Sequence, residues 1–181
     1  VSNRPDKRGA LKSRGEVVGA GRWPKTNVPR ARKVGVTAVG IIGMGRVGRA
    51  IAQRGAAMKT RILCTDLGPI AALDYTFVAD IHSLAQEVDV LILAASADGG
   101  QVIINQSVLE ALGPQGYFIN VARGKLVDES ALLAALREKR IAGAGLDVFA
   151  NEPHVPEGFF SLNNVTLQPH RASATVQTRL E

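Results

Sequence analysis

The feature that most constrains the fold is a glycine-rich turn between an apolar segment and a helical one. The apolar segment, Val39–Ile42, is followed by glycines in the arrangement Gly-x-Gly-x-x-Gly, at Gly43, Gly45 and Gly48. Small and apolar residues then recur at helical spacing, at Val47, Ala50, Ile51 and Ala57. This order predicts a strand, a tight turn and the start of a helix.

Such a turn is typical of a dinucleotide site. The first glycine permits the turn, the second lets the backbone approach a pyrophosphate, and the third lets the helix pack against the strand. Backbone N–H groups and the positive end of the helix dipole then face the anion. The residues predicted to bind the cofactor here are Gly43, Met44, Gly45, Arg46, Val47 and Gly48.

An acidic residue stands where such a site needs one. A second apolar run, Arg61–Thr65, ends at Asp66, which follows Gly48 by 18 residues (66 − 48). At that distance a carboxylate binds a ribose hydroxyl, and it repels the 2′-phosphate of NADP. The next residues, 67–69, supply no arginine to receive that phosphate, so the sequence favours NAD over NADP. A flavin dinucleotide, or a glycine turn in an ordinary α/β protein, remains the alternative.

Charge is concentrated at the start of the chain. Residues 1–33 hold ten of the 22 Lys and Arg residues and two of the 16 acidic residues, so the net charge of +6 belongs to this irregular segment. We expect it to be solvated, and we do not expect a nucleic-acid partner. The only cysteine, Cys64, is expected to be buried, which fits a reducing, cytoplasmic location. No apolar run is long enough to cross a bilayer, and no metal site is predicted.

Strands and helices alternate along the rest of the chain. The predicted strands are Tyr75–Val78, Val88–Ala95, Tyr117–Val121, Ala144–Phe149 and Val165–Gln168. The predicted helices are Ile81–Gln86, Ser107–Leu112 and Glu129–Arg140, the last capped by Asp128 and closed by Gly143. This alternation predicts an α/β fold with a doubly wound, mostly parallel sheet.

Four polar residues follow predicted strands: Asp66, Arg123, Glu152 and His170. Ligands of such sheets bind outside the carboxyl ends of the strands. An arginine can bind a carboxylate with two hydrogen bonds, and an imidazole beside a carboxylate can deliver a proton to a carbonyl oxygen. A dinucleotide, an anion clamp and a proton donor together can reduce a 2-keto acid. Each residue also has an ordinary interpretation, as a surface ion pair, a turn cap or a satisfied histidine.

Three stretches closely resemble the D-isomer-specific 2-hydroxyacid dehydrogenases, which include the glyoxylate/hydroxypyruvate reductases. They are VGIIGMGRVGRAIA, INVARGKLVDESALLAALREKRIAGAGLDVFANEP and NVTLQPHRASATVQTR. The resemblance extends from about Gly21 to the end and implies a Rossmann-type NAD-binding domain. It also argues against flavin.

The resemblance assigns roles to individual residues. Arg123 would bind the carboxylate and carbonyl of the substrate, His170 would be the acid/base, and Glu152 would be its partner. Asp147 would lie near the nicotinamide, and Ala122, Arg123 and His170 would also contact the cofactor. Arg171 departs from the family pattern, in which a smaller apolar residue is commoner after the histidine.

Members of this family also have a substrate domain, of which this chain contains little. We expect an irregular segment at 1–33, the dinucleotide-binding domain at 34–170, and the start of the return to the substrate domain at 171–181. The primary hypothesis is an NAD-dependent dehydrogenase for a small 2-keto or 2-hydroxy acid, forming a homodimer. The alternative is a non-catalytic NAD-binding interaction or regulatory module of the same fold.

Overall fold

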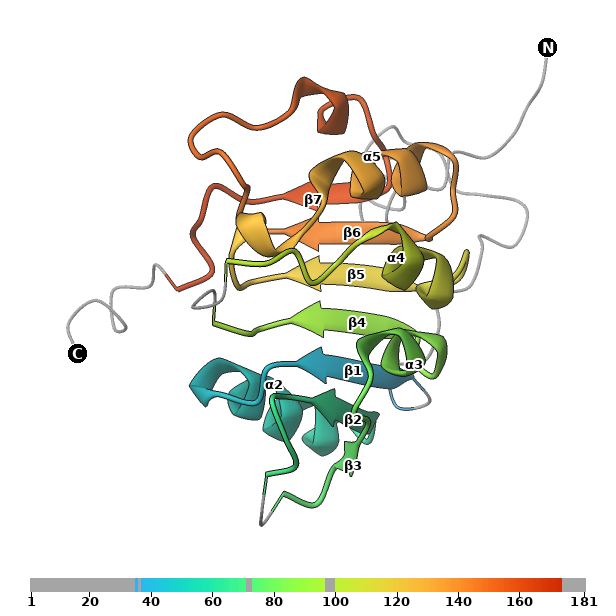
Figure 1. The fold of residues 1–181 in the computed structure, drawn as a ribbon, viewed down its shortest axis with the longest axis vertical. Coiled ribbons are helices and arrows are strands. Elements are labelled where there is room, and N and C mark those ends of the chain that lie inside the picture. Colours follow the sequence, from blue (N-terminus) through green and yellow to red (C-terminus); the bar gives the residue numbers. More distant parts are fainter. Residues whose placement is uncertain (1–34, 36, 71–72, 97–99, 174–181) are drawn as a thin grey trace, which may run out of the picture.

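The computed structural model describes residues 35, 37–70, 73–96 and 100–173. They form a sheet in the order β3-β2-β1-β4-β5-β6-β7, in which all neighbouring strands are parallel (Figure 1). The strands are β1 (Ala38–Ile42), β2 (Arg61–Thr65), β3 (Thr76–Phe77), β4 (Val90–Leu93), β5 (Tyr117–Asn120), β6 (Gly143–Leu146) and β7 (Val165–Leu167). The predicted basic segment, 1–33, and residues 174–181 lie outside the described residues.

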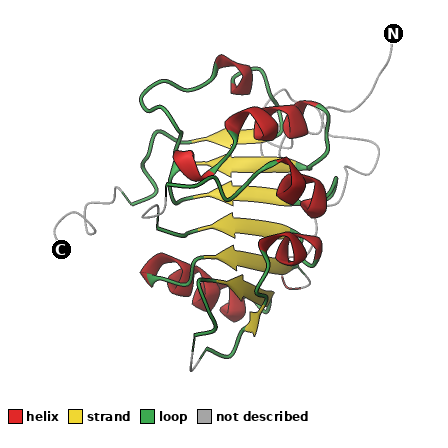
Figure 2. Ribbon diagram, viewed as in Figure 1, coloured by secondary structure: helices red, strands yellow, loops and turns green. Residues whose placement is uncertain are grey.

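Helices cover both faces of the sheet (Figure 2). The α-helices are α2 (Arg46–Ala57), α3 (Ile81–Gln86), α4 (Gln106–Leu112) and α5 (Glu129–Arg137), and the short 3-10 helices are η2 (Gly124–Leu126) and η3 (Glu157–Phe159). Neighbouring strand residues alternate between the two cores: Ile41 packs with Ala52 of α2, whereas Ile42 belongs to the cluster that contains Leu84 of α3 and Leu132 of α5. The doubly wound sheet predicted from the sequence is confirmed.

The strand order reverses between β1 and β4. From β1 the chain winds outward through β2 and β3, and it then crosses back to β4 on the other side of β1. Connections on either side of such a switch point leave in opposite directions, so a crevice forms at the carboxyl ends of the strands. The glycine turn after β1 and the polar residues after β5, β6 and β7 all lie at this edge.

The helix after Asp128 is shorter than the sequence predicts. It ends at Arg137, and Lys139 adopts a positive φ of 58°, which ends the helical path before Arg140. Gly143 does not close the helix. It is the first residue of β6, where an added Cβ would lie 2.7 Å from the carbonyl oxygen of Asn164.

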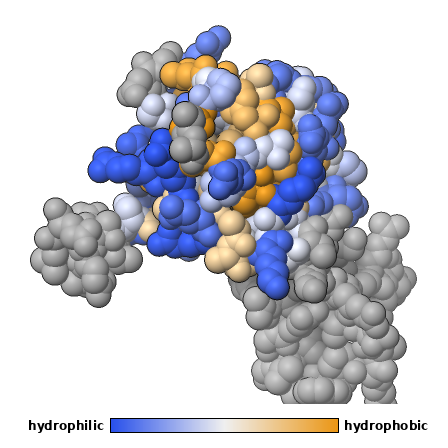
Figure 3. All heavy atoms as spheres, turned by 90° about the horizontal axis from the view of Figure 1, so that it is seen from below, coloured by the Kyte–Doolittle hydropathy of each residue, from blue (hydrophilic) through white to orange (hydrophobic). Residues whose placement is uncertain are grey.

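The surface at the β3 end of the sheet mixes hydrophilic and apolar side chains (Figure 3). Leu67, in the loop after β2, is fully exposed, and Met58 is exposed at the end of α2. Among the described residues, none of the helices combines the length and the apolar character that a membrane span needs.

Candidate active site

The three glycines of the turn after β1 meet three different steric conditions. Gly43 has a φ of 92°, and an added Cβ would lie 2.4 Å from the Cα of Ala95. An added Cβ on Gly48, in α2, would lie 2.0 Å from the carbonyl oxygen of Gly43. At Gly45 nothing lies within 4 Å of the Cβ position. Gly43 and Gly48 are therefore fixed by the fold, whereas the space at Gly45 is open to a ligand.

The amino-terminus of α2 differs from those of the other described α-helices. Side chains of Asp80, Asn105 and Asp128 accept backbone N–H groups at the starts of α3, α4 and α5. Helix α2 begins after Gly45, without a side-chain cap and without an acidic residue in its first turn. Its N–H groups and dipole are therefore available to an anion, such as a pyrophosphate.

Asp66 joins the end of β2 to the glycine turn. Its Oδ2 accepts a hydrogen bond from the N–H of Met44 at 2.6 Å, and its Oδ1 accepts one from the N–H of Leu67 at 2.8 Å. Strands β1 and β2 run parallel with Ile42 opposite Thr65, which brings the two strand ends together. Asp66 thus lies beside the turn, as a ribose partner must.

Arg123 is carried by a turn that a buried amide shapes. Asn120, the last residue of β5, is 1% exposed. Its Oδ1 accepts from the N–H of Ala122 at 3.0 Å, and its Nδ2 donates to the carbonyl of Arg123 at 3.2 Å. One terminal nitrogen of the Arg123 guanidinium donates to the carbonyl of Ala122 at 2.7 Å, and the side chain is otherwise exposed.

His170 and Glu152 form a pair, as predicted. The Nδ1 of His170 lies 2.8 Å from the Oε2 of Glu152, and the Oε1 of Glu152 accepts from the N–H of Phe149 at 2.9 Å. These two hydrogen bonds, the one to His170 first, lower the pKa of the Glu152 carboxyl below its ordinary value. The charge of the Arg123 guanidinium lowers this pKa further, so Arg123 lies within electrostatic reach of the pair.

Asp147 holds the turn that carries His170. It is 7% exposed, and its carboxylate oxygens accept the N–H groups of Arg171 at 2.7 Å and Ala172 at 3.0 Å. The N–H of His170, whose φ is 54°, donates to the carbonyl of Asp147 at 2.8 Å. Asp147 therefore supports a left-handed backbone conformation that is uncommon for residues other than glycine.

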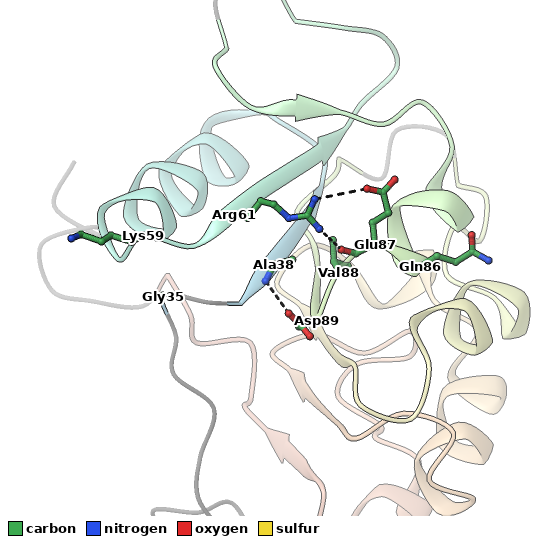
Figure 4. Close-up of a pocket in the computed structure, with 8 residues that line it drawn as sticks. All are labelled: Gly35, Ala38, Lys59, Arg61, Gln86, Glu87, Val88 and Asp89. Carbon is green, nitrogen blue, oxygen red and sulfur yellow. Dashed lines mark hydrogen bonds and ion pairs between the residues drawn. The ribbon is translucent and has the colours of Figure 1, made fainter.

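An apolar hollow of about 340 Å³ lies beside the pair, between the segment after β6 and the end of β7. Its lining includes His170, Glu152, Phe160 and Leu167. Another hollow, of about 390 Å³, lies at the opposite edge, where the strands begin (Figure 4). There Arg61 contacts Glu87, and Asp89 accepts the N–H of Ala38 at 2.9 Å. Ligands of such sheets bind at the carboxyl edge, so we place the candidate site there.

The predicted residues thus form two groups along one edge of the sheet. The glycine turn and Asp66 lie at the ends of β1 and β2, and the second group follows β5, β6 and β7 and consists of Ala122, Arg123, Asp147, Glu152 and His170. Asn120 was not among the site residues predicted from the sequence. Its signal was an amide at the end of a buried apolar strand, where a polar group requires partners.

Comparisons with known proteins identify the family. Residues 8–172 match the family model described as "D-isomer specific 2-hydroxyacid dehydrogenase, NAD binding domain". The chain is 47% identical to a 2-ketogluconate reductase of Gluconobacter oxydans over 90% of its own length and 53% of that protein. It is 42% identical to a hydroxyphenylpyruvate reductase of Plectranthus scutellarioides, over 88% of this chain and 51% of that protein.

Solved structures agree with these relatives. A 2-hydroxyacid dehydrogenase of Ketogulonicigenium vulgare superposes with a TM-score of 0.86 at 38% identity, over 96% of this chain and 55% of that one. An NADPH-dependent glyoxylate/hydroxypyruvate reductase of Sinorhizobium meliloti gives 0.81 at 41% identity, over 96% and 53%. The chain spans about half the length of the relatives it matches. It belongs to the NAD-binding domain family of the D-isomer-specific 2-hydroxyacid dehydrogenases, as the sequence motifs predict.

Proposed function

We propose that this chain is the coenzyme-binding part of an NAD-dependent oxidoreductase that interconverts a small 2-keto acid and its 2-hydroxy acid. The observation that carries the proposal is the pairing of His170 with Glu152 at 2.8 Å at the same sheet edge as the glycine turn. Several relatives are named as glyoxylate or hydroxypyruvate reductases, and we propose a substrate of that type.

The glycine turn fits the pyrophosphate of a dinucleotide. The open space at Gly45 lets the phosphates approach the backbone, and the uncapped start of α2 offers N–H donors from Arg46, Val47 and Gly48. At the other end we propose that four residues line the nicotinamide: Ala122, Arg123, Asp147 and His170. When bound, NADH supplies the hydride that reduces the keto carbon.

The second group of residues would bind and protonate the substrate. Arg123 carries N–H donors beyond the one that binds Ala122, and they can hold the substrate carboxylate in the plane of the guanidinium. His170 has Nδ1 directed to Glu152, which leaves Nε2 to donate a proton to the carbonyl oxygen as the hydride arrives at C2. In the reverse direction, neutral His170 accepts the proton of the hydroxyl group.

Asp66 supports NAD rather than NADP as the preferred cofactor. Its carboxylate already lies at the turn, bound to the N–H of Met44, and would repel a 2′-phosphate. One similar reductase is described as NADPH-dependent, and a similar dehydrogenase of Lactobacillus delbrueckii is described as an NAD complex. We also propose a cytoplasmic homodimer, which sedimentation and fractionation would test.

Turnover of the chain with NADH and glyoxylate, hydroxypyruvate or phenylpyruvate tests the proposal, alongside a calorimetric titration with NADH. In His170→Asn we expect turnover to fall by about 10²- to 10⁴-fold, the usual contribution of an acid/base residue. NADH affinity should remain. The matched control is His154→Asn, which changes an exposed histidine in the connection between β6 and β7, the segment that also carries Glu152. NADH binding without turnover in the parent chain would identify a coenzyme module, which is either one part of a longer enzyme or a domain with a non-catalytic role.

A further inference from the structure

Three contacts converge on the backbone of Phe149 and Ala150, just after β6. The first is backbone packing against Gly124, the first residue of η2 and the neighbour of Arg123. An added Cβ on Gly124 would lie 1.9 Å from the carbonyl carbon of Phe149 and 2.2 Å from the nitrogen of Ala150. The turn that carries Arg123 is therefore in direct backbone contact with this peptide.

The other two contacts are carboxylates on adjacent N–H groups. The N–H of Ala150 donates to the Oε1 of Glu129 at 2.8 Å, and the N–H of Phe149 donates to the Oε1 of Glu152 at 2.9 Å. Glu129 is partly buried at the start of α5, where Asp128 already caps the helix. Glu129 is therefore not needed as the cap, and its carboxylate is committed to the segment after β6.

These contacts extend to the acid/base pair. Glu152 uses one carboxylate oxygen for the N–H of Phe149 and the other for His170. If the peptide at Phe149 moves, Glu152 loses one of its two hydrogen-bond partners and the other must reorient. A shift of about 1 Å at a catalytic group can cost about 10²-fold in rate, so this peptide has to stay fixed.

We propose that Glu129 is a positioning residue: by holding Ala150 it fixes the backbone on which Glu152 orients His170. Its role in catalysis rests on the proposed function, whereas its effect on the Glu152 carboxyl does not. Besides the N–H of Phe149, the groups that act on this carboxyl are His170, from the turn after β7, and Arg123, from the turn before η2.

Three variants of Glu129 separate its acceptor from its charge. Glu129→Ala removes both. Glu129→Asp keeps the charge at the start of α5 but is one methylene too short to reach Ala150, and it also serves if the alanine variant does not fold. Glu129→Gln loses the charge and keeps an acceptor oxygen at the right length. Glu138→Ala is the control, because its carboxylate contacts Arg140 at the far end of α5.

The pKa of the Glu152 carboxyl is measured by carbon-13 NMR titration, and NADH affinity and turnover are measured for the same variants. In Glu129→Ala and Glu129→Asp we expect the pKa of Glu152 to rise toward its ordinary value, and turnover to fall by about 10- to 100-fold, with NADH affinity unchanged. Glu129→Gln and Glu138→Ala should match the parent chain. The proposal would be overturned if the pKa of Glu152 in both Glu129→Ala and Glu129→Asp equalled that of the parent chain. It would also be overturned if Glu129→Gln showed the same raised Glu152 pKa and the same loss of turnover as Glu129→Ala. A parent chain that binds no NADH would refute the proposed function, and the titration would still test the positioning.

Discussion

Alanine substitutions at Gly48 and Gly45 should separate the folding role of the glycine turn from its binding role. A Cβ on Gly48 would lie 2.0 Å from the carbonyl oxygen of Gly43, and real Cβ atoms essentially never approach within 3.0 Å. The backbone must therefore open by about 1 Å between α2 and the turn. Overpacking of this kind costs about 1–3 kcal/mol, and because the clash is with a backbone atom we expect the upper part of this range, which exceeds the roughly 1 kcal/mol by which a helix favours alanine over glycine.

The same change at Gly45 should leave stability almost unaltered. Nothing lies within 4 Å of the added Cβ, and the φ of −67° and ψ of −164° suit alanine. We expect the free energy of unfolding to change by less than about 0.5 kcal/mol. The methyl group would instead occupy the space reserved for the phosphates, so NADH affinity should fall at least tenfold, or about 1.4 kcal/mol.

Urea unfolding measures the first effect, and calorimetric titration with NADH measures the second. The expected pattern is a destabilised Gly48→Ala and a stable Gly45→Ala that binds NADH weakly. A Gly45→Ala chain that binds NADH as tightly as the parent would refute the assignment of the open space to the phosphates. A Gly48→Ala chain as stable as the parent would refute the steric reasoning.

Three further changes test other contacts. The pKa of Glu152 is lowered in the folded chain, so its ionised form contributes stability above pH 4.5 that is lost as the pH falls through the lowered value. The difference in unfolding free energy between the parent and Glu152→Gln should therefore shrink on acidification, as denaturation at several pH values will show. Asp66→Asn keeps an acceptor for Met44 and removes the charge, so the ratio of NADPH to NADH affinity in titrations should rise at least about tenfold, since like charges in contact cost a few kcal/mol. Asp128→Ala removes the cap on the N–H of Ala131 and should lower the unfolding free energy by about 1 kcal/mol in urea.

Local sequence patterns predicted the limits of those helices and strands whose ends are marked by a capping residue or by the end of an apolar run. The limits of β2 and α3 agree with the predictions, because apolar runs or caps mark them. The predicted end of α5, at Arg140, was wrong because Arg137, Lys139 and Arg140 all suit a helix terminus. Only the positive φ of Lys139 shows where the chain leaves the helix. The pairing of Glu152 with His170 was predicted from the resemblance to the 2-hydroxyacid dehydrogenases, whereas their positions after parallel strands predicted only that both lie at one edge of the sheet.

Contacts between distant backbone segments could not be predicted from local patterns. The packing of Gly124 against Phe149 and the hydrogen bond from Ala150 to Glu129 join segments that are not adjacent in the sequence. The helix dipole already explains a glutamate in the first turn of a helix, so the sequence gives no sign that Glu129 also binds the N–H of Ala150. The hydrogen bonds from the N–H groups of Arg171 and Ala172 to Asp147 were likewise not predicted, because the resemblance to the family implied only that Asp147 lies near the nicotinamide.

The most direct test of the central claim is transfer of deuterium from NADH deuterated at C4 to a 2-keto acid. The chain is incubated with the labelled cofactor and glyoxylate, hydroxypyruvate or phenylpyruvate, and the product is analysed by NMR. We expect deuterium at C2 of at least one 2-hydroxy acid with the parent chain, and a large loss of this signal with His170→Asn. If NADH binds and no product carries deuterium, the glycine turn serves a coenzyme module that does not catalyse hydride transfer.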